Sequence, residues 1–172
     1  MISNIVVSAA GRGTRMGQLA KHLPKHLIKV ADRPFLTYLL DNIVAAGFTN
    51  IYVVVGYQAT AAYDFLQQYS LPASVRLTII NQFERLGEDK YGTLMPLLAV
   101  ASELGGQPLV SVNGDNLYSV HDLQQMAQVT GSAVAGLKHN NPERYGVLVP
   151  GLNNTLEKII EKSPTPPSNF IN

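Results

Sequence analysis

The sequence predicts an α/β fold with a mostly parallel sheet, in which strands alternate with helices along the chain. Two observations carry this prediction. Short apolar runs rich in β-branched residues, such as 5–9 and 50–56, alternate with segments such as 36–44, whose apolar residues recur at helical spacing. No repeat, linker or low-complexity segment divides the 172 residues, so we expect a single domain over 1–172.

The first half of the chain is expected to fold as strands joined by helices. A helix after Pro34 should end at Gly47, because glycine readily adopts the left-handed conformation that closes a helix. The polar stretch 81–92 is expected to be a loop. The other expected elements are strands at 5–9, 50–56 and 75–80, a short extended piece at 27–30 and a helix at 58–69.

The second half continues this alternation. Thr93 is expected to cap a helix that runs through Glu103 with Pro96 in its first turn, and Ser119 with Asp122 resembles a capping box. The remaining expected elements are strands at 108–112, 132–138, 145–149 and 155–161, a helix from 119 to 129 and an irregular tail from 163 to 172.

Composition narrows the classes of partner. Thirteen Lys and Arg against twelve Asp and Glu leave a net charge of +1, so no overall charge attracts nucleic acid or an acidic membrane. The chain has no cysteine and no apolar run near the ~20 residues of a membrane span, so we expect a soluble, cytoplasmic protein. Residues 1–33 nevertheless hold six of the thirteen basic residues, which suits a small polyanion.

The most specific motif follows the first predicted strand. It reads A-A-G-R-G-T-R-M over residues 9–16 and is followed by Pro24-Lys25. A glycine-rich turn at the carboxyl end of a strand exposes backbone amides to an anion, and this edge is where open α/β sheets bind ligands. Arg15 and Lys25 add two cations that suit phosphate groups.

A second candidate site follows the strand predicted at 108–112, in the turn Asn113-Gly114-Asp115. An aspartate at a strand end provides the hard oxygen ligand that Mg²⁺ prefers. None of the four histidines stands in a metal-ligand pattern, and we expect them to be exposed or hydrogen-bonded.

The unbroken A-A-G-R-G-T-R-M string and its P-K resemble the signature of the sugar-1-phosphate nucleotidyltransferases. The resemblance implies a three-layer α/β/α Rossmann-like fold with a mixed, mostly parallel sheet. It also implies Mg²⁺-dependent transfer of a nucleotidyl group from an NTP to a sugar 1-phosphate, with release of pyrophosphate. These two substrates would be the partners, with no nucleic acid and no membrane.

The resemblance also implies roles for single residues. Arg15, Lys25 and Asp115 would be catalytic, with Asp115 as the Mg²⁺ ligand. The nucleotide would be bound by Ala10, Gly11, Arg12, Gly13, Thr14, Arg15, Lys25, Gln82, Gly92 and Thr93. The sugar phosphate would be bound by Asn113, Tyr145, Gly146, Glu161, Lys162 and Asn172.

Two alternatives stay open beside this interpretation. Cytidylyltransferases that act on phosphocholine or a similar alcohol phosphate share the N-terminal signature. A non-catalytic regulatory subunit that binds a nucleotide or sugar nucleotide is possible in a different class, because no residue here matches the second metal ligand that follows Asn172 in the family. The chain is therefore expected to be incomplete at its C-terminus.

Overall fold

The computed structural model describes residues 1–13 and 23–172, and these residues form two compact units. Unit 1 is Met1–Gln128 and unit 2 is Val129–Asn172. Each unit contains its own sheet. The expectation of a single domain stays a prediction.

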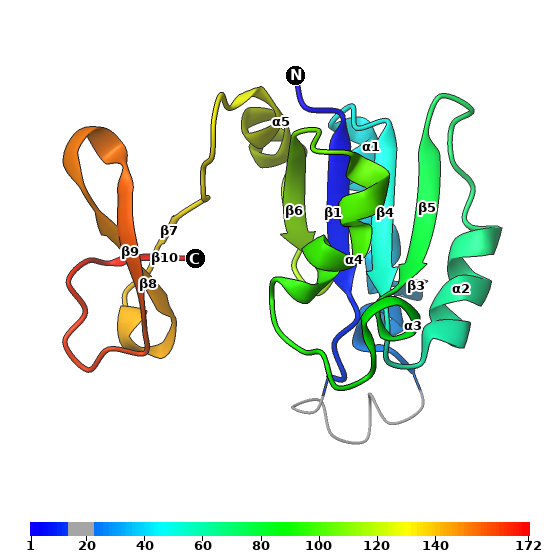
Figure 1. Ribbon diagram of the computed structural model, residues 1–172, viewed down its shortest axis with the longest axis horizontal. Coiled ribbons are helices and arrows are strands. Elements are labelled where there is room, and N and C mark those ends of the chain that lie inside the picture. The colour runs from blue at the N-terminus through cyan, green and yellow to red at the C-terminus, as the bar shows by residue number, and fades with distance from the viewer. Residues whose placement is uncertain (14–22) are drawn as a thin grey trace. The chain divides into compact units, whose positions relative to one another are not determined.

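Unit 1 is built on a four-stranded parallel sheet with the order β5-β4-β1-β6 (Figure 1). Its strands are β1 (Asn4–Ala9), β4 (Asn50–Val55), β5 (Arg76–Asn81) and β6 (Leu109–Asn113). Parallel pairing sets Val7 of β1 opposite Val53 of β4 and Val112 of β6. Helical crossovers join these strands, because parallel neighbours cannot be linked by a tight turn.

Helices cover both faces of this sheet, so unit 1 has three layers. Alternate residues of β1 separate the two cores: Ile5 and Val7 pack in one, and Val6 packs in the other. The first core also holds residues of α1 (Phe35–Ala45), α2 (Ala59–Gln68) and α5 (Val120–Gln128). The second core holds residues of α4 (Met95–Leu104). The α/β/α fold with a parallel sheet is thereby confirmed.

The main difference from the expected elements lies in residues 81–95. The segment expected to be a loop contains the short helix α3 (Gln82–Leu86), whose first turn is capped by the Asn81 side chain accepting from the Phe83 amide at 3.1 Å. Five residues are too few to show a helical repeat in the sequence. The expectation that Thr93 caps the next helix was wrong, because α4 begins at Met95 with Leu94 as its N-cap.

The piece expected at 27–30 is divided between two elements. Residues Lys25–Leu27 form the 3-10 helix η2, and β2 (Lys29–Val30) pairs with β3 (Arg33–Pro34) in a small antiparallel hairpin. Pro24 supplies the N-cap position of η2, where a missing amide donor costs nothing.

Unit 2 is an antiparallel four-stranded sheet with the order β7-β10-β8-β9. Its strands are β7 (Leu137–Lys138), β8 (Gly146–Pro150), β9 (Leu156–Glu161) and β10 (Phe170–Ile171), with the 3-10 turns η3 (Pro142–Arg144) and η4 (Leu152–Asn154). The strand expected at 132–138 is limited to its last two residues, and residues 132–136 are exposed. The tail expected to be irregular contains β10, which pairs with β7 and β8.

Within the two described ranges, no helix combines the length and the apolar character that crossing a bilayer requires.

Candidate functional site

The strand order of unit 1 creates a switch point between β1 and β6. From β1 the chain passes to its neighbour β4 and then to β5, and it returns to pair β6 along the other edge of β1 (Figure 1). In open α/β sheets, ligands bind outside the carboxyl ends of the strands at such a point. Residues 10–13 follow β1 there, and Gly114 and Asp115 follow β6.

Three of the predicted residues come together at this point. The Lys25 ammonium donates a hydrogen bond to Asp115 Oδ2 at 2.5 Å, across 90 positions of sequence. A Cβ added to Gly11 would lie 3.9 Å from both Cε and Nζ of Lys25, so the glycine turn runs beside this cation. The two charged side chains stay 24% and 42% exposed, which leaves them accessible to a ligand.

Close backbone packing brings the turn of Asp115 against β1. The Gly114 amide donates to the Ser8 carbonyl at 2.9 Å. A Cβ on Gly114 would lie 3.0 Å from that carbonyl oxygen and 3.1 Å from Ala9 Cβ, so a larger residue would push the turn away. The Tyr118 hydroxyl, which sequence reasoning did not single out, accepts from the Asn113 amide at 3.2 Å and holds the start of the turn.

The glycine turn after β1 is also tied to β4. The Tyr57 amide donates to the Ala10 carbonyl at 3.2 Å, and a Cβ on Gly56 would lie 3.0 Å from Ala10 Cβ. Gly13 has a φ of 63°, a left-handed conformation that favours glycine. Thr14 and Arg15, both predicted to bind the nucleotide, lie outside the described residues.

His26 differs from the expectation of exposed or hydrogen-bonded histidines. Its side chain is 1% exposed, and neither ring nitrogen has a hydrogen-bond partner among the residues that the structure describes. Burial, with a smaller contribution from the neighbouring Lys25 ammonium, lowers the pKa of His26 to about 4. The His26 imidazole, next to Lys25, is therefore neutral at neutral pH.

The predicted nucleotide residues of the 82–93 segment have different environments. Gln82 is 3% exposed, and its Nε2 donates to the Lys90 carbonyl at 2.9 Å. Gly92 and Thr93 are exposed, and Gly92 has a φ of 123°. Buried Gln82 therefore holds the loop from inside, whereas the other two lie on its surface.

Tyr91 links this segment to the glycine turn. The Arg12 guanidinium lies 5.0 Å from the centre of the Tyr91 ring, within the range of a cation–π contact. Phe83 of α3 meets the same ring edge-on, with 6.0 Å between centroids. Sequence reasoning missed Tyr91, and its position next to Gly92 was the one available signal.

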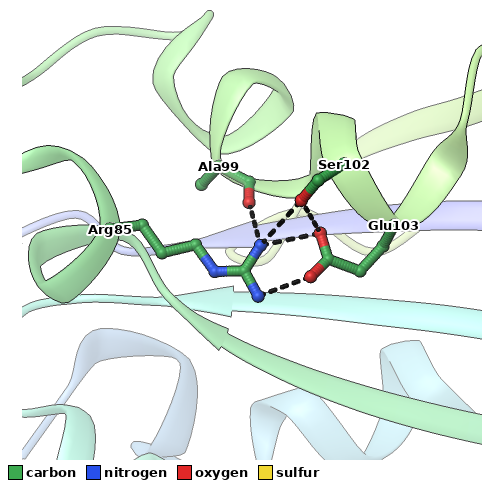
Figure 2. A network of polar contacts seen from close by, with 4 residues as sticks. All are labelled: Arg85, Ala99, Ser102 and Glu103. Carbon is green, nitrogen blue, oxygen red and sulfur yellow. Dashed lines mark hydrogen bonds and ion pairs between the residues drawn. The ribbon is translucent and has the colours of Figure 1, made fainter.

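An ion-pair network joins α3 to α4 on either side of the loop 87–94 (Figure 2). The Arg85 guanidinium binds both carboxylate oxygens of Glu103, at 2.7 and 2.5 Å. It also donates to the Ala99 carbonyl at 2.8 Å. The Ser102 hydroxyl donates to Glu103 Oε2 at 2.9 Å, which completes the network.

This network predicts a pH-dependent contribution to stability. The hydrogen bonds from Arg85 lower the pKa of Glu103 from its ordinary 4.5 to about 2. A carboxylate with a depressed folded-state pKa stabilises the protein above its unfolded pKa and loses that contribution as the pH falls. We expect Glu103→Gln to reduce the free energy of unfolding by at most about 1 kcal/mol at pH 6, because the pair is partly exposed. Urea unfolding should show this difference shrinking between pH 4.5 and about 2. In an Arg85→Met background most of the difference should be lost, because only the hydrogen bond from Ser102 to Glu103 and a backbone contribution remain.

Unit 2 gathers three of the residues predicted to bind the sugar phosphate. A Cβ added to Gly146 would lie 2.8 Å from Glu161 Oε1 and would also collide with the Asn172 side chain. The backbone amide of Asn172 donates to the Gly146 carbonyl at 3.0 Å. Gly146 therefore lies beneath two polar side chains that a larger residue would displace.

The other two predicted sugar-phosphate residues of unit 2 are joined through the backbone. The Lys162 amide donates to the Tyr145 carbonyl at 3.0 Å, and Lys162 has a φ of 48°. The His139 ring, which sequence reasoning left aside, meets Tyr145 edge-on at 4.8 Å between centroids. His139 Nδ1 accepts from the Asn141 amide at 2.9 Å, so in the neutral ring the proton is on Nε2.

Comparisons with known proteins give similarities over nearly the whole chain. It is 28% identical over 167 residues to a bifunctional sugar-1-phosphate nucleotidylyltransferase/acetyltransferase of Sulfurisphaera tokodaii, covering 96% of this chain and 38% of the relative. It is 29% identical over 173 residues to a UTP–glucose-1-phosphate uridylyltransferase of Haloferax volcanii, covering 96% of this chain and 68% of the relative. The chain thus spans well under half of the first relative's length.

A solved structure with the same fold is the UDP-glucose pyrophosphorylase of Acinetobacter baumanii, with a TM-score of 0.77 and 23% identity. The similarity covers 99% of this chain and 72% of that one. The family model described as nucleotidyl transferase matches residues 4–172, which include both compact units. The chain therefore belongs to the nucleotidyl transferase family.

Proposed function

We propose that the protein transfers a nucleotidyl group from an NTP to a sugar 1-phosphate, giving an NDP-sugar and pyrophosphate. The observation that carries the proposal is the convergence of the Gly11 turn, Lys25 and Asp115 at the switch point between β1 and β6. Membership of the nucleotidyl transferase family supports the class of reaction. The names of relatives that act on glucose 1-phosphate and mannose 1-phosphate support the class of acceptor.

The reaction is an in-line displacement at phosphorus. An oxygen of the acceptor's phosphate forms a bond to the α-phosphorus of the NTP while the bond to the bridging oxygen breaks, and pyrophosphate leaves with that electron pair. The nucleophile is already an anion, so no protein base is required. Catalysis then depends on positioning and on compensation of the negative charge that shifts to the leaving group.

The residues of unit 1 supply these requirements. Residues 10–13 follow β1 at the strand edge where a triphosphate would lie, and a glycine-rich turn at such a position offers backbone amides to an anion. Lys25, held beside Gly11, places an ammonium group where it can contact phosphate oxygens. Arg15 would add a second cation from the same signature.

Asp115 is the residue that would hold Mg²⁺. Among the described residues, no group of three or more His, Cys, Asp or Glu side chains could form a metal cage. Mg²⁺ is commonly bound by one or two carboxylates together with substrate phosphates and water, so a partly exposed aspartate beside a phosphate site fits this ion. The ion would supply positive charge next to the reacting phosphates.

The residues of unit 2 around Gly146 are assigned to the sugar phosphate. Glu161 and Asn172 place polar atoms above Gly146, where they can bind sugar hydroxyl groups. The backbones of Tyr145 and Lys162 are hydrogen-bonded to each other, and the charge of a lysine side chain suits the phosphate.

Pyrophosphate release from a panel of the four NTPs and several phosphorylated acceptors, with and without Mg²⁺, tests the proposal. We expect release that requires Mg²⁺ and a sugar 1-phosphate. Release with phosphocholine and CTP alone would favour a cytidylyltransferase. Nucleotide binding without release for any acceptor would favour a regulatory subunit and contradict the proposal.

A further inference from the structure

The loop 87–94 has a path that its own backbone does not determine. Gly87 and Gly92 have φ values of 97° and 123°, and within the loop the backbone makes a turn in which the Lys90 amide donates to the Gly87 carbonyl at 3.3 Å. Glycine gives each of these positions access to conformations of nearly equal energy. The position of the loop therefore depends on contacts made by the elements at its two ends.

One such contact comes from inside the protein. Gln82, in the first turn of α3, is 3% exposed and donates to the Lys90 carbonyl in the middle of the loop at 2.9 Å. Its Oε1 is buried and has no hydrogen-bond partner among the described residues. Gln82 therefore fixes the loop relative to α3. The position of the loop relative to α4 then depends on how α3 is attached to α4.

Arg85 holds α3 against α4, the helix that follows the loop (Figure 2). Its two-pronged bond to Glu103 and its bond to the Ala99 carbonyl reach α4 at two successive turns. A bidentate guanidinium–carboxylate pair limits both the separation and the relative rotation of the helices that carry it. Both ends of the loop are thereby held to one another.

The loop in turn meets the glycine turn of the candidate site. Tyr91 lies under the Arg12 guanidinium at 5.0 Å and against Phe83 of α3 at 6.0 Å between ring centroids. A shift of α3 relative to α4 would therefore move Tyr91 and Lys90 at the edge of the site. Arg85 and Glu103 themselves lie outside this contact.

We infer that the Arg85–Glu103 pair is a positioning element that sets the conformation of loop 87–94 and so determines which nucleobase is preferred. The inference rests on the proposed function, because it requires an NTP at the adjoining site. The pair can bias two loop conformations only by its own interaction free energy. For a partly exposed pair this corresponds to a change of about fivefold in base preference.

The experiment measures the dissociation constants of all four NTPs by titration calorimetry for the wild type and three variants. We expect Arg85→Met to lower the ratio between the best and second-best NTP by about fivefold. Arg85→Lys should give an intermediate ratio, because lysine keeps the charge but cannot form the bidentate bond. Arg33→Met is the matched control: it removes an exposed ion pair with Asp41, of 2.8 Å, and should leave the ratio unchanged.

Thermal unfolding measures how much stability each variant loses. An Arg85→Met variant that is less stable but keeps the wild-type relative affinities for the four NTPs would overturn the inference. Glu103→Gln, a milder change, provides the same comparison if Arg85→Met does not fold. A wild type that binds NTPs without preference would also overturn the inference while leaving the proposed function intact. A wild type that binds no NTP would contradict both.

Discussion

Replacing Asp115 with asparagine is expected to lower kcat for pyrophosphate release by about 10²–10³. Asparagine keeps the size of the side chain and an oxygen that can accept from Lys25, which binds Asp115 at 2.5 Å. It removes the negative charge that would hold Mg²⁺ beside the phosphates. The loss should therefore appear mainly in kcat, measured by steady-state kinetics at saturating NTP and acceptor.

Asp41→Asn is the control for this change. Asp41 also forms an exposed ion pair, and its side chain is 47% exposed against 42% for Asp115. It lies on α1, outside the turns after β1 and β6 that form the site. We expect its kcat to match that of the wild type. An Asp115→Asn enzyme with wild-type kcat would exclude Asp115 as the metal ligand.

Replacing Gly146 with valine is expected to raise KM for the acceptor by about tenfold or more. The new side chain would begin with a Cβ 2.8 Å from Glu161 Oε1 and would displace both Glu161 and Asn172. Loss of one hydrogen bond from a charged group to the acceptor costs about 1.5–3 kcal/mol, which is a factor of ten or more. The dissociation constant of the NTP, which is assigned to unit 1, should not change.

A double-mutant cycle shows whether the effect acts through Glu161. If valine at 146 works by displacing Glu161, Glu161→Ala should add little to the acceptor KM of Gly146→Val. Additive effects would mean that the two residues act independently. An unchanged acceptor KM in Gly146→Val would exclude this surface of unit 2 as the sugar site.

Much of the fold could be predicted from the chain because local signals agreed with tertiary packing. The strands β1 and β4 each contain a run of Ile and Val residues, and both are buried on two faces. The serine half of the capping box was confirmed, since the Ser119 hydroxyl accepts from the Asp122 backbone amide at 3.1 Å. The signals failed where pairing partners decide the outcome, as in the two-residue strands β7 and β10.

The sequence predicted the residues of the site better than it predicted their contacts. Motifs in the sequence predict five of the site residues that the structure brings into contact: Gly11, Lys25, Asp115, Gly146 and Glu161. The contacts of Gln82 and Tyr91 were not foreseen, because a buried glutamine bound to a loop carbonyl has no local sequence pattern. The Arg85–Glu103 pair was missed for the same reason: its residues are 18 positions apart, on two different helices.

The amino-acid order alone specified the alternation of strands and helices, the glycine turn after β1 and the types of charge available to bind phosphate. These follow from side-chain periodicity and backbone freedom, which are properties of neighbouring residues. The three-dimensional packing settled which charges meet: Lys25 and Asp115 pair because β6 returns to the edge of β1. Contacts between distant segments depend on the strand order. The sequence around each contacting residue does not indicate which distant residue it will meet.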